Sequence, residues 1–214
     1  VYYYTVMPID KAGNKQAGGN VQVSTESASA EGVLSIAPEA GHVGDEIEIR
    51  GEGFSPGVNV RIKLGTEEIT VKADGEGKFT AKLRVPALPR GEHQIVAEGD
   101  DGRKAEEKFD VEPRIKEVSP SEAPVGSAVT ITGDGFSAGA EVTVKIGGKP
   151  ASVMNGGRTN ENGELVVYLL KSETAKLSGP CDCELEVTDS TSKMFTVWRD
   201  FIQFKDQLTT WEEP

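Results

Sequence analysis

One phrase is written twice in this chain, at residues 36–57 and again at residues 118–139. Prolines, glycines and a phenylalanine recur in it at a constant spacing, in the pairs Pro38/Pro120, Gly44/Gly126, Gly51/Gly133, Phe54/Phe136 and Gly57/Gly139. The offset is the same in every pair, since 120 − 38 and 139 − 57 both equal 82. A spacing shared by several such residues indicates an internal repeat, so the chain contains two tandem copies of one unit of roughly 80 residues.

Each copy consists of short runs in which apolar and polar residues alternate, separated by turns rich in glycine and aspartate. Alternation with a period of two is typical of half-buried β-strands. In the first copy we expect strands at Leu34–Ile36, Glu46–Arg50, Val58–Leu64, Ile69–Val71, Lys78–Val85, Gln94–Ala97 and Ala105–Val111. In the second copy we expect strands at Ile115–Val118, Val129–Thr132, Val142–Ile146, Ala151–Val153, Glu164–Leu170, Cys183–Val187 and Lys193–Val197. This number and spacing of short strands predicts an all-β fold made of two immunoglobulin-like β-sandwiches.

The repeated phrase resembles the TIG/IPT family of immunoglobulin-like domains. The family pattern is a strand ending in Ser/Ala-Pro, followed by Gly-x-x-Val/Ile-x-Ile-x-Gly-x-Gly-Phe, and the resemblance covers residues 33–111 and 114–197. It implies an E-set type of sandwich that serves as a spacer or contact module in surface proteins and beside extracellular carbohydrate-active enzymes. Glycine can adopt the positive φ of the Gly-x-Gly turn, and we expect Phe54 and Phe136 to cap the core beneath it.

The first 25 residues contain two more alternating runs around the turn sequence Ala12-Gly13-Asn14, which predicts a β-hairpin. Its Tyr-x-Tyr-x-Val run, Asp-x-Ala-Gly-Asn loop and final Val-x-Val run resemble the last two strands of a fibronectin type III domain. A lone hairpin is marginally stable in water. We therefore expect either the end of a longer domain or a hairpin that adds to a neighbouring subunit, and such head-to-tail docking could build a filament.

The charge of the chain argues against one class of partner. The net charge is −12, and no section of the chain is net positive. Because nucleic-acid affinity depends largely on contacts between basic side chains and phosphates, nucleic acid is not expected as a partner. No apolar run approaches the roughly 18 residues that a membrane-spanning segment needs.

The sequence contains no pattern typical of an enzyme or of a metal site. It lacks a Gly-x-Ser-x-Gly elbow, a phosphate-binding loop and a His-Glu-x-x-His motif. Its two histidines, His42 and His93, are expected in surface loops. The turns at Asp100-Asp101-Gly102 and at Asp189 offer one or two carboxylates each, whereas calcium takes six to eight oxygen ligands. We therefore expect no catalytic residue, no metal and no cofactor, and solvated aspartates in these turns.

The two cysteines, Cys181 and Cys183, are the only ones in the chain. In a strand they would lie on one face, because side chains alternate from face to face. We expect inert thiols, with a strained disulfide or weak metal binding as alternatives.

Aromatic residues are concentrated outside the first copy, because residues 33–113 contain neither Tyr nor Trp. Near the C-terminus, Trp198, Phe201, Phe204, Leu208 and Trp211 follow one another at spacings of three or four, which favours a helix. This tail could fold on the second copy as a helix or an extended arm, begin a further module, contact another chain or offer a surface for sugars. We name as partner-binding candidates these five residues and the tyrosines Tyr2, Tyr3 and Tyr4, with Tyr168 as a further sugar-binding candidate.

These observations predict a division of the chain into a terminal hairpin (1–25), a linker (26–32), two sandwiches (33–113 and 114–197) and an aromatic tail or the start of another module (198–214). The predicted function is that of a non-catalytic structural or adhesive region of a large extracellular or cell-surface protein, with neighbouring domains or subunits as protein partners. The alternative is an accessory, carbohydrate-binding region of an extracellular carbohydrate-active enzyme.

Overall fold

The computed structural model describes residues 2–6, 19–23, 31–154, 157–177, 181–190 and 197–205. The chain divides into two compact units, residues 1–31 and residues 32–214. In the first unit, β1 (Tyr2–Val6) pairs antiparallel with β2 (Gly19–Val23). The predicted hairpin is therefore confirmed, and its assignment to a fibronectin type III-like domain stays a prediction.

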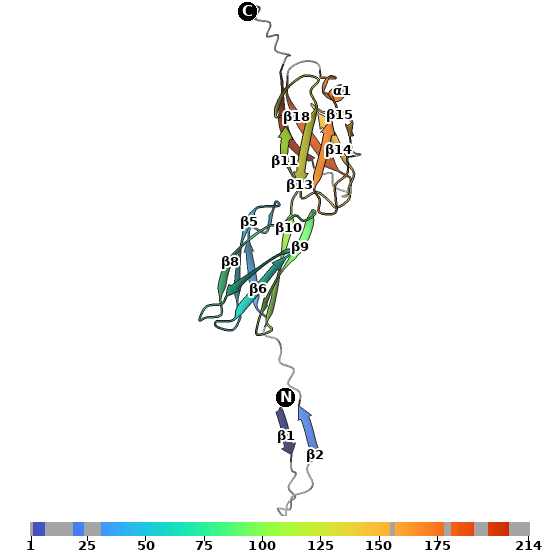
Figure 1. Ribbon diagram of the computed structural model, residues 1–214. Coiled ribbons are helices and arrows are strands. Elements are labelled where there is room, and N and C mark those ends of the chain that lie inside the picture. Colours follow the sequence, from blue (N-terminus) through green and yellow to red (C-terminus); the bar gives the residue numbers. More distant parts are fainter. Residues whose placement is uncertain are drawn as a thin grey trace, which may run out of the picture. The chain divides into compact units, whose positions relative to one another are not determined.

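The first sandwich of the second unit is built from two sheets, with strand orders β3-β5-β8 and β4-β10-β9-β6-β7 (Figure 1). Its strands are β3 (Val33–Ala37), β4 (Ala40–Gly41), β5 (Glu46–Glu52), β6 (Asn59–Leu64), β7 (Glu67–Lys72), β8 (Phe79–Arg84), β9 (Gly91–Gly99) and β10 (Lys104–Val111). All pairings are antiparallel except that of β4 with β10.

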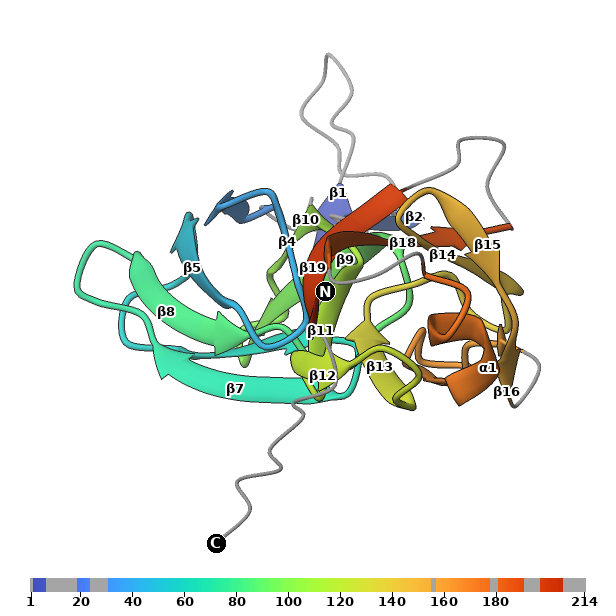
Figure 2. The same cartoon turned by 90° about the horizontal axis from the view of Figure 1, so that it is seen from above.

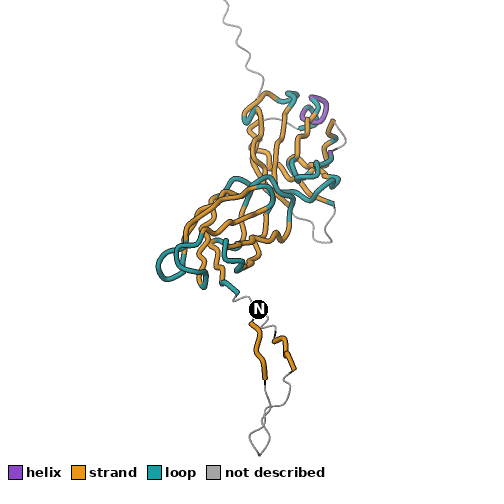
Figure 3. Tube along the Cα trace, turned by 60° about the horizontal axis from the view of Figure 1, so that its bottom comes forward, coloured by secondary structure: helices purple, strands orange, loops and turns teal. Residues whose placement is uncertain are grey.

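The second sandwich repeats this plan with strand orders β11-β13-β17-β16 and β12-β19-β18-β14-β15. Its strands are β11 (Arg114–Ser119), β12 (Glu122–Pro124), β13 (Val129–Asp134), β14 (Val142–Ile146), β15 (Lys149–Ala151), β16 (Val153–Met154), β17 (Leu165–Leu169), β18 (Cys181–Asp189) and β19 (Val197–Lys205). The short helix α1 (Lys171–Thr174) follows β17 in this sandwich (Figure 2). Strands dominate the described part of the chain, as the colours of Figure 3 show, so the all-β prediction is confirmed.

Each sandwich has its own hydrophobic core. Buried residues alternate with exposed ones along the strands, as in β6, where Val60, Ile62 and Leu64 are buried. The buried side chains form two clusters, one drawn from residues between 34 and 111 and the other from residues between 118 and 187, and the clusters share no member. Phe54 is 2% exposed and Phe136 is fully buried, so the prediction that both rings belong to the core is confirmed.

The turn beneath each of these phenylalanines is built in the same way in both sandwiches. Phe54 donates its backbone N–H to Gly77 at 3.1 Å, and Phe136 donates to Gly163 at 3.0 Å. Both glycines have a positive φ, 75° and 73°, and a Cβ added to either would lie 2.0 Å from the phenylalanine carbonyl oxygen. No side chain fits at these two positions, so the turn requires glycine.

Of the two forms expected for the tail, the helix is wrong and the extended arm folded on the second copy is confirmed for the residues that the structure describes. Residues 197–205 form β19, which pairs with β18 on one side and with β12 on the other. The boundary expected between residues 197 and 198 is therefore also wrong, since the second sandwich continues at least to Lys205. Spacings of three and four favour a helix locally, but the backbone groups of this segment are satisfied by two neighbouring strands, and such tertiary pairing overrides a local periodicity. The expected last strand at Lys193–Val197 lies outside the described residues except at Val197.

The two cysteines differ from the expectation of free thiols. They form a disulfide between Cys181 and Cys183 at the start of β18. The strand places both residues on one face, as alternation predicts. The alternative of a disulfide was therefore the correct one.

Candidate functional site

The connection between the two sandwiches is short and tied down. β10 ends at Val111 and β11 begins at Arg114, which leaves Glu112 and Pro113 between them. The backbone N–H of Glu112 donates to the carbonyl of Gly41 at 2.8 Å. Pro113 is buried, and its ring restricts φ. The connection therefore has few freely rotating bonds.

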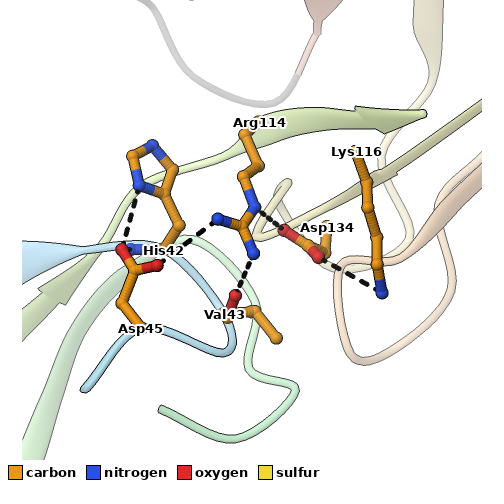
Figure 4. A network of polar contacts seen from close by, with 6 residues as sticks. All are labelled: His42, Val43, Asp45, Arg114, Lys116 and Asp134. Carbon is orange, nitrogen blue, oxygen red and sulfur yellow. Dashed lines mark hydrogen bonds and ion pairs between the residues drawn. The ribbon is translucent and has the colours of Figure 1, made fainter. Parts of the chain in front are cut away.

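Arg114 bridges the two sandwiches directly after this connection (Figure 4). Its guanidinium group contacts a carboxylate in each sandwich, Asp134 at 3.2 Å and Asp45 at 3.4 Å. It also donates a hydrogen bond to the carbonyl of Val43, which belongs to the first sandwich. A planar guanidinium with five donors can serve several acceptors in fixed directions, which a lysine ammonium cannot. We call Arg114, Asp45, Val43 and Asp134 the Arg114 bridge.

The acidic partner in the first sandwich is itself positioned by a histidine. The backbone N–H of His42 donates to Asp45 Oδ2 at 2.9 Å, and its Nδ1 lies 3.3 Å from the same oxygen. Partial burial raises the pKa of Asp45, but the hydrogen bonds from His42 and the charge of Arg114 outweigh it and lower this pKa below its ordinary value. Asp45 is therefore ionised at neutral pH, as its contact with Arg114 requires.

A second set of contacts joins the sandwiches through the repeated turn of the second one. The backbone N–H of Arg90 donates to the carbonyl of Phe136 at 3.0 Å. Gly135 lies against the connection, because a Cβ added to it would be 2.5 Å from the carbonyl oxygen of Glu112. Gly163 lies against the first sandwich in the same way, with an added Cβ 2.9 Å from Cα of Pro89. The contact between the sandwiches is thus close enough to exclude a methyl group.

The junction was not found from the sequence. At the offset of the repeat, Arg114 corresponds to Gly32 and Asp134 corresponds to Glu52, so neither is among the residues that the two copies share. The only signal in the sequence was that Arg114, at the boundary between the two copies, differs from its counterpart Gly32 in the first copy. His93 differs from the expected loop position, because it lies in β9 with Nε2 2.7 Å from the carbonyl oxygen of Pro89. His42 lies in a loop as expected, between β4 and β5, but it is half-buried in the junction.

The turn aspartates considered for calcium have a structural role instead of being solvated. Asp101 accepts the backbone N–H of Ser55 at 3.1 Å, and Asp189 accepts that of Ser137 at 2.8 Å. These serines occupy equivalent positions, since 137 − 55 is again 82, so the two carboxylates support the same turn in each sandwich. Within the described ranges, no group of three or more His, Cys, Asp or Glu side chains is arranged to hold a metal ion.

The aromatic residues expected to bind partners fall into separate parts of the structure. Tyr2, Tyr3 and Tyr4 are in β1 of the first unit, whereas Trp198, Phe201 and Phe204 are in β19. Leu208 and Trp211 lie outside the described residues. Trp198 is paired with Val187 and Phe204 with Cys181 across the ladder between β19 and β18. Their role in binding a partner stays a prediction.

The described part of the chain contains no candidate for a membrane-spanning helix. None of its helices has the length and apolar character needed to cross a bilayer.

Comparison with known proteins adds a family assignment for the second sandwich. Residues 113–196 match the model of the IPT/TIG domain. No curated protein sequence matches the chain.

Among solved structures, the chain resembles invasin, a bacterial integrin-binding protein, at 17% identity and a TM-score of 0.36, over 82% of this chain and 39% of that one. It resembles the adhesin InvE of Yersinia pseudotuberculosis at 16% identity and a TM-score of 0.37, over 81% of this chain and 58% of that one. It also resembles SGBP-B, from a xyloglucan utilization locus of Bacteroides uniformis, at 15% identity and a TM-score of 0.32, over 80% of this chain and 48% of that one. The chain thus spans less than two thirds of each of these three proteins.

The match ends one residue before β19 begins, and it includes the repeated phrase with Phe136 and its glycines. The first sandwich carries the same phrase at the constant offset and forms the same turn with the same hydrogen bond. Residues 113–196 therefore match the IPT/TIG domain, and the first sandwich, which precedes them, has the same plan.

Proposed function

We propose that the two sandwiches form a non-catalytic spacer in a large extracellular or cell-surface protein, which holds neighbouring parts of that protein apart at a defined angle. The observation that carries this proposal is the junction. A connection of two residues, one of them a buried proline, is combined with the Arg114 bridge and with the backbone contact between Arg90 and Phe136. Such a junction restricts bending between the two modules, whereas domains joined by flexible linkers move freely by default.

The charge distribution supports a spacer whose surface is polar and does not stick to neighbouring domains. Exposed ion pairs cover the surface of the first sandwich, for example Lys82 with Glu46 at 2.6 Å and Lys108 with Glu92 at 2.9 Å. Exposed pairs of this kind contribute little to stability. They keep the surface polar, and the net charge of −12 opposes self-association.

Pulsed electron–electron double resonance on the full chain tests this function. Spin labels at Glu67→Cys in β7 and Lys149→Cys in β15, both exposed positions, report the distance between the two sandwiches. We expect a narrow distance distribution that broadens in an Arg114→Gln variant and stays narrow in the matched control Arg61→Gln, since Arg61 pairs with Glu68 inside one sandwich. A broad distribution already in the unmodified junction would contradict a rigid spacer.

Contacts with neighbouring subunits are a separate part of the proposal. We infer that the hairpin of β1 and β2 contributes to such contacts, because a two-stranded sheet has unpaired edges. Light scattering on the chain with and without residues 1–25 tests this contribution. A monomer in both cases would rule out hairpin-mediated assembly.

A further inference from the structure

The two sandwiches differ sharply on one equivalent face. In the first sandwich, the outward positions of β5 and β8 are Glu46, Glu48, Arg50, Thr80, Lys82 and Arg84. The equivalent outward positions of the second sandwich are Ala128, Thr130, Thr132, Val166, Tyr168 and Leu170, aligned by the repeated phrase and by the turn glycines Gly77 and Gly163. Five of the six side chains are charged in the first set and none in the second. We call the second set, together with Met154, the neutral face.

The neutral face exposes apolar side chains beside hydroxyl groups. Met154 is 50% exposed, Val166 47%, Tyr168 40% and Leu170 39%. The strand register places Tyr168 between Thr130 of β13 and Met154 of β16. In the first sandwich the equivalent residue, Lys82, forms an ion pair with Glu46. The fold therefore tolerates a fully charged surface here, and burial does not require the aromatic residue.

A groove of about 500 Å³ continues the neutral face toward the junction. Thr132 and Val166 of the neutral face line it, together with polar side chains that include Asn160, Arg158 and Glu164. The charged side chains in its lining have both signs, with Lys116 and Arg158 opposite in charge to Glu117, Asp134 and Glu164. The groove thus offers hydrogen-bond donors and acceptors at close range, and its size falls in the usual range for small-molecule sites.

One carboxylate oxygen in this groove has an incomplete environment. Asp134 is 4% exposed and lines the groove, and its Oδ2 atom is buried without a hydrogen bond. The Lys116 ammonium lies 3.9 Å from it. Because this oxygen is buried, a ligand in the groove meets the exposed polar groups around it, among them Lys116.

We propose that the neutral face and the adjoining groove bind a short neutral oligosaccharide. A sugar ring has an apolar face that can pack on Tyr168 and Val166, and a rim of hydroxyl groups that can donate to Glu164 and accept from Asn160 and Arg158. The absence of charge on the face favours an uncharged ligand, and the net charge of −12 on the chain repels a polyanion.

The exposed area argues against a second copy of this chain as the occupant. Four side chains of this size, each at most half exposed, offer at most about 500 Å². A stable interface requires about 800 Å² on each partner. The apolar side chains of the face alone are therefore too small for a stable dimer interface, and they are large enough for two or three sugar rings.

Native affinity electrophoresis of the full chain tests the proposal. Gels contain one soluble polysaccharide each: the neutral xyloglucan, arabinoxylan, glucomannan, galactomannan or hydroxyethyl cellulose, or the anionic alginate. We expect retardation by at least one neutral polymer and none by alginate. Titration calorimetry with oligosaccharides of the retained polymer then gives the affinity, which should fall about tenfold or more in Tyr168→Ala, as expected for the loss of one aromatic contact.

The repeat itself provides the matched variants. The double variant Val166→Thr/Tyr168→Lys introduces the residues that the first sandwich carries at these positions, so it should fold and lose retention. Lys82→Gln on the equivalent face of the first sandwich should leave retention unchanged, and circular dichroism confirms that each variant is folded. The proposal is overturned if no neutral polymer retards the chain, if only alginate does, if retention survives the double variant, or if light scattering shows a dimer that this variant dissociates.

Discussion

Replacing the turn glycine under each core phenylalanine tests the shared architecture of the two sandwiches. In Gly77→Ala and Gly163→Ala, the new Cβ would lie 2.0 Å from the carbonyl oxygen of Phe54 or Phe136, and φ is positive at both positions. A left-handed conformation costs an alanine about 1–2 kcal/mol. Moving the turn also breaks the hydrogen bond from the phenylalanine N–H to the glycine carbonyl, which is worth about 0.5–1.5 kcal/mol. Alanine restricts the unfolded chain more than glycine does, which stabilises the folded state by about 0.4–1 kcal/mol. We expect each variant to lower the free energy of unfolding by about 0.5–3 kcal/mol.

Two spectroscopic signals separate the sandwiches in a urea titration. Residues 33–113 contain no Trp or Tyr, so tryptophan fluorescence reports the second sandwich, while far-UV circular dichroism reports both. Gly163→Ala should move the fluorescence transition, which reports the second sandwich, to a lower urea concentration. Gly77→Ala should move the unfolding transition of the first sandwich, which circular dichroism detects and tryptophan fluorescence does not, to a lower urea concentration. Gly75→Ala is the control, because an added Cβ there meets nothing within 4 Å. A control as costly as Gly77→Ala, or losses below about 0.5 kcal/mol in both variants, would refute the reasoning.

Two further predictions concern the core and the junction. Phe54→Ala and Phe136→Ala should each lower the free energy of unfolding by about 3–5 kcal/mol in urea titrations, because both rings are buried, and a loss near zero would contradict their place in the core. Asp45→Asn should destabilise the chain at pH 7 and make no difference well below pH 3.8, since a carboxyl whose pKa is lowered on folding contributes stability above its ordinary pKa of 3.8 and loses it as the pH falls through the lowered value. Thermal melts of both proteins between pH 2 and 7 measure this, and a difference that persists at the lowest pH would contradict it.

The strands and cores were predictable because their signals are local. Alternation in segments such as Val58–Leu64 determines which side chains face inward. Glycines mark the turns, and at Gly77 and Gly163 no larger residue fits. The constant offset between the copies also transfers each conclusion from one copy to the other. Phe54 and Phe136 could therefore be placed in the core before any contact was known.

The helical alternative for the tail was wrong for a physical reason. Residues 198–204 have the spacing of a helix face, but two strands distant in the sequence, β12 and β18, leave a gap in a sheet that this segment fills. A backbone that can pair on both sides gains more from the sheet than from a short helix. Such a gap exists only once the other strands have assembled.

The sequence by itself determined the repeat, the strand pattern, the buried phenylalanines and the glycines of their turns, because each of these follows from neighbours along the chain. The tertiary structure alone decided what lies between and beside these elements. The Arg114 bridge joins residues 45, 114 and 134, and the neutral face assembles residues of β13, β16 and β17 beside a groove. Contacts across long sequence separations leave no periodic signal, since the chain must fold before those side chains meet.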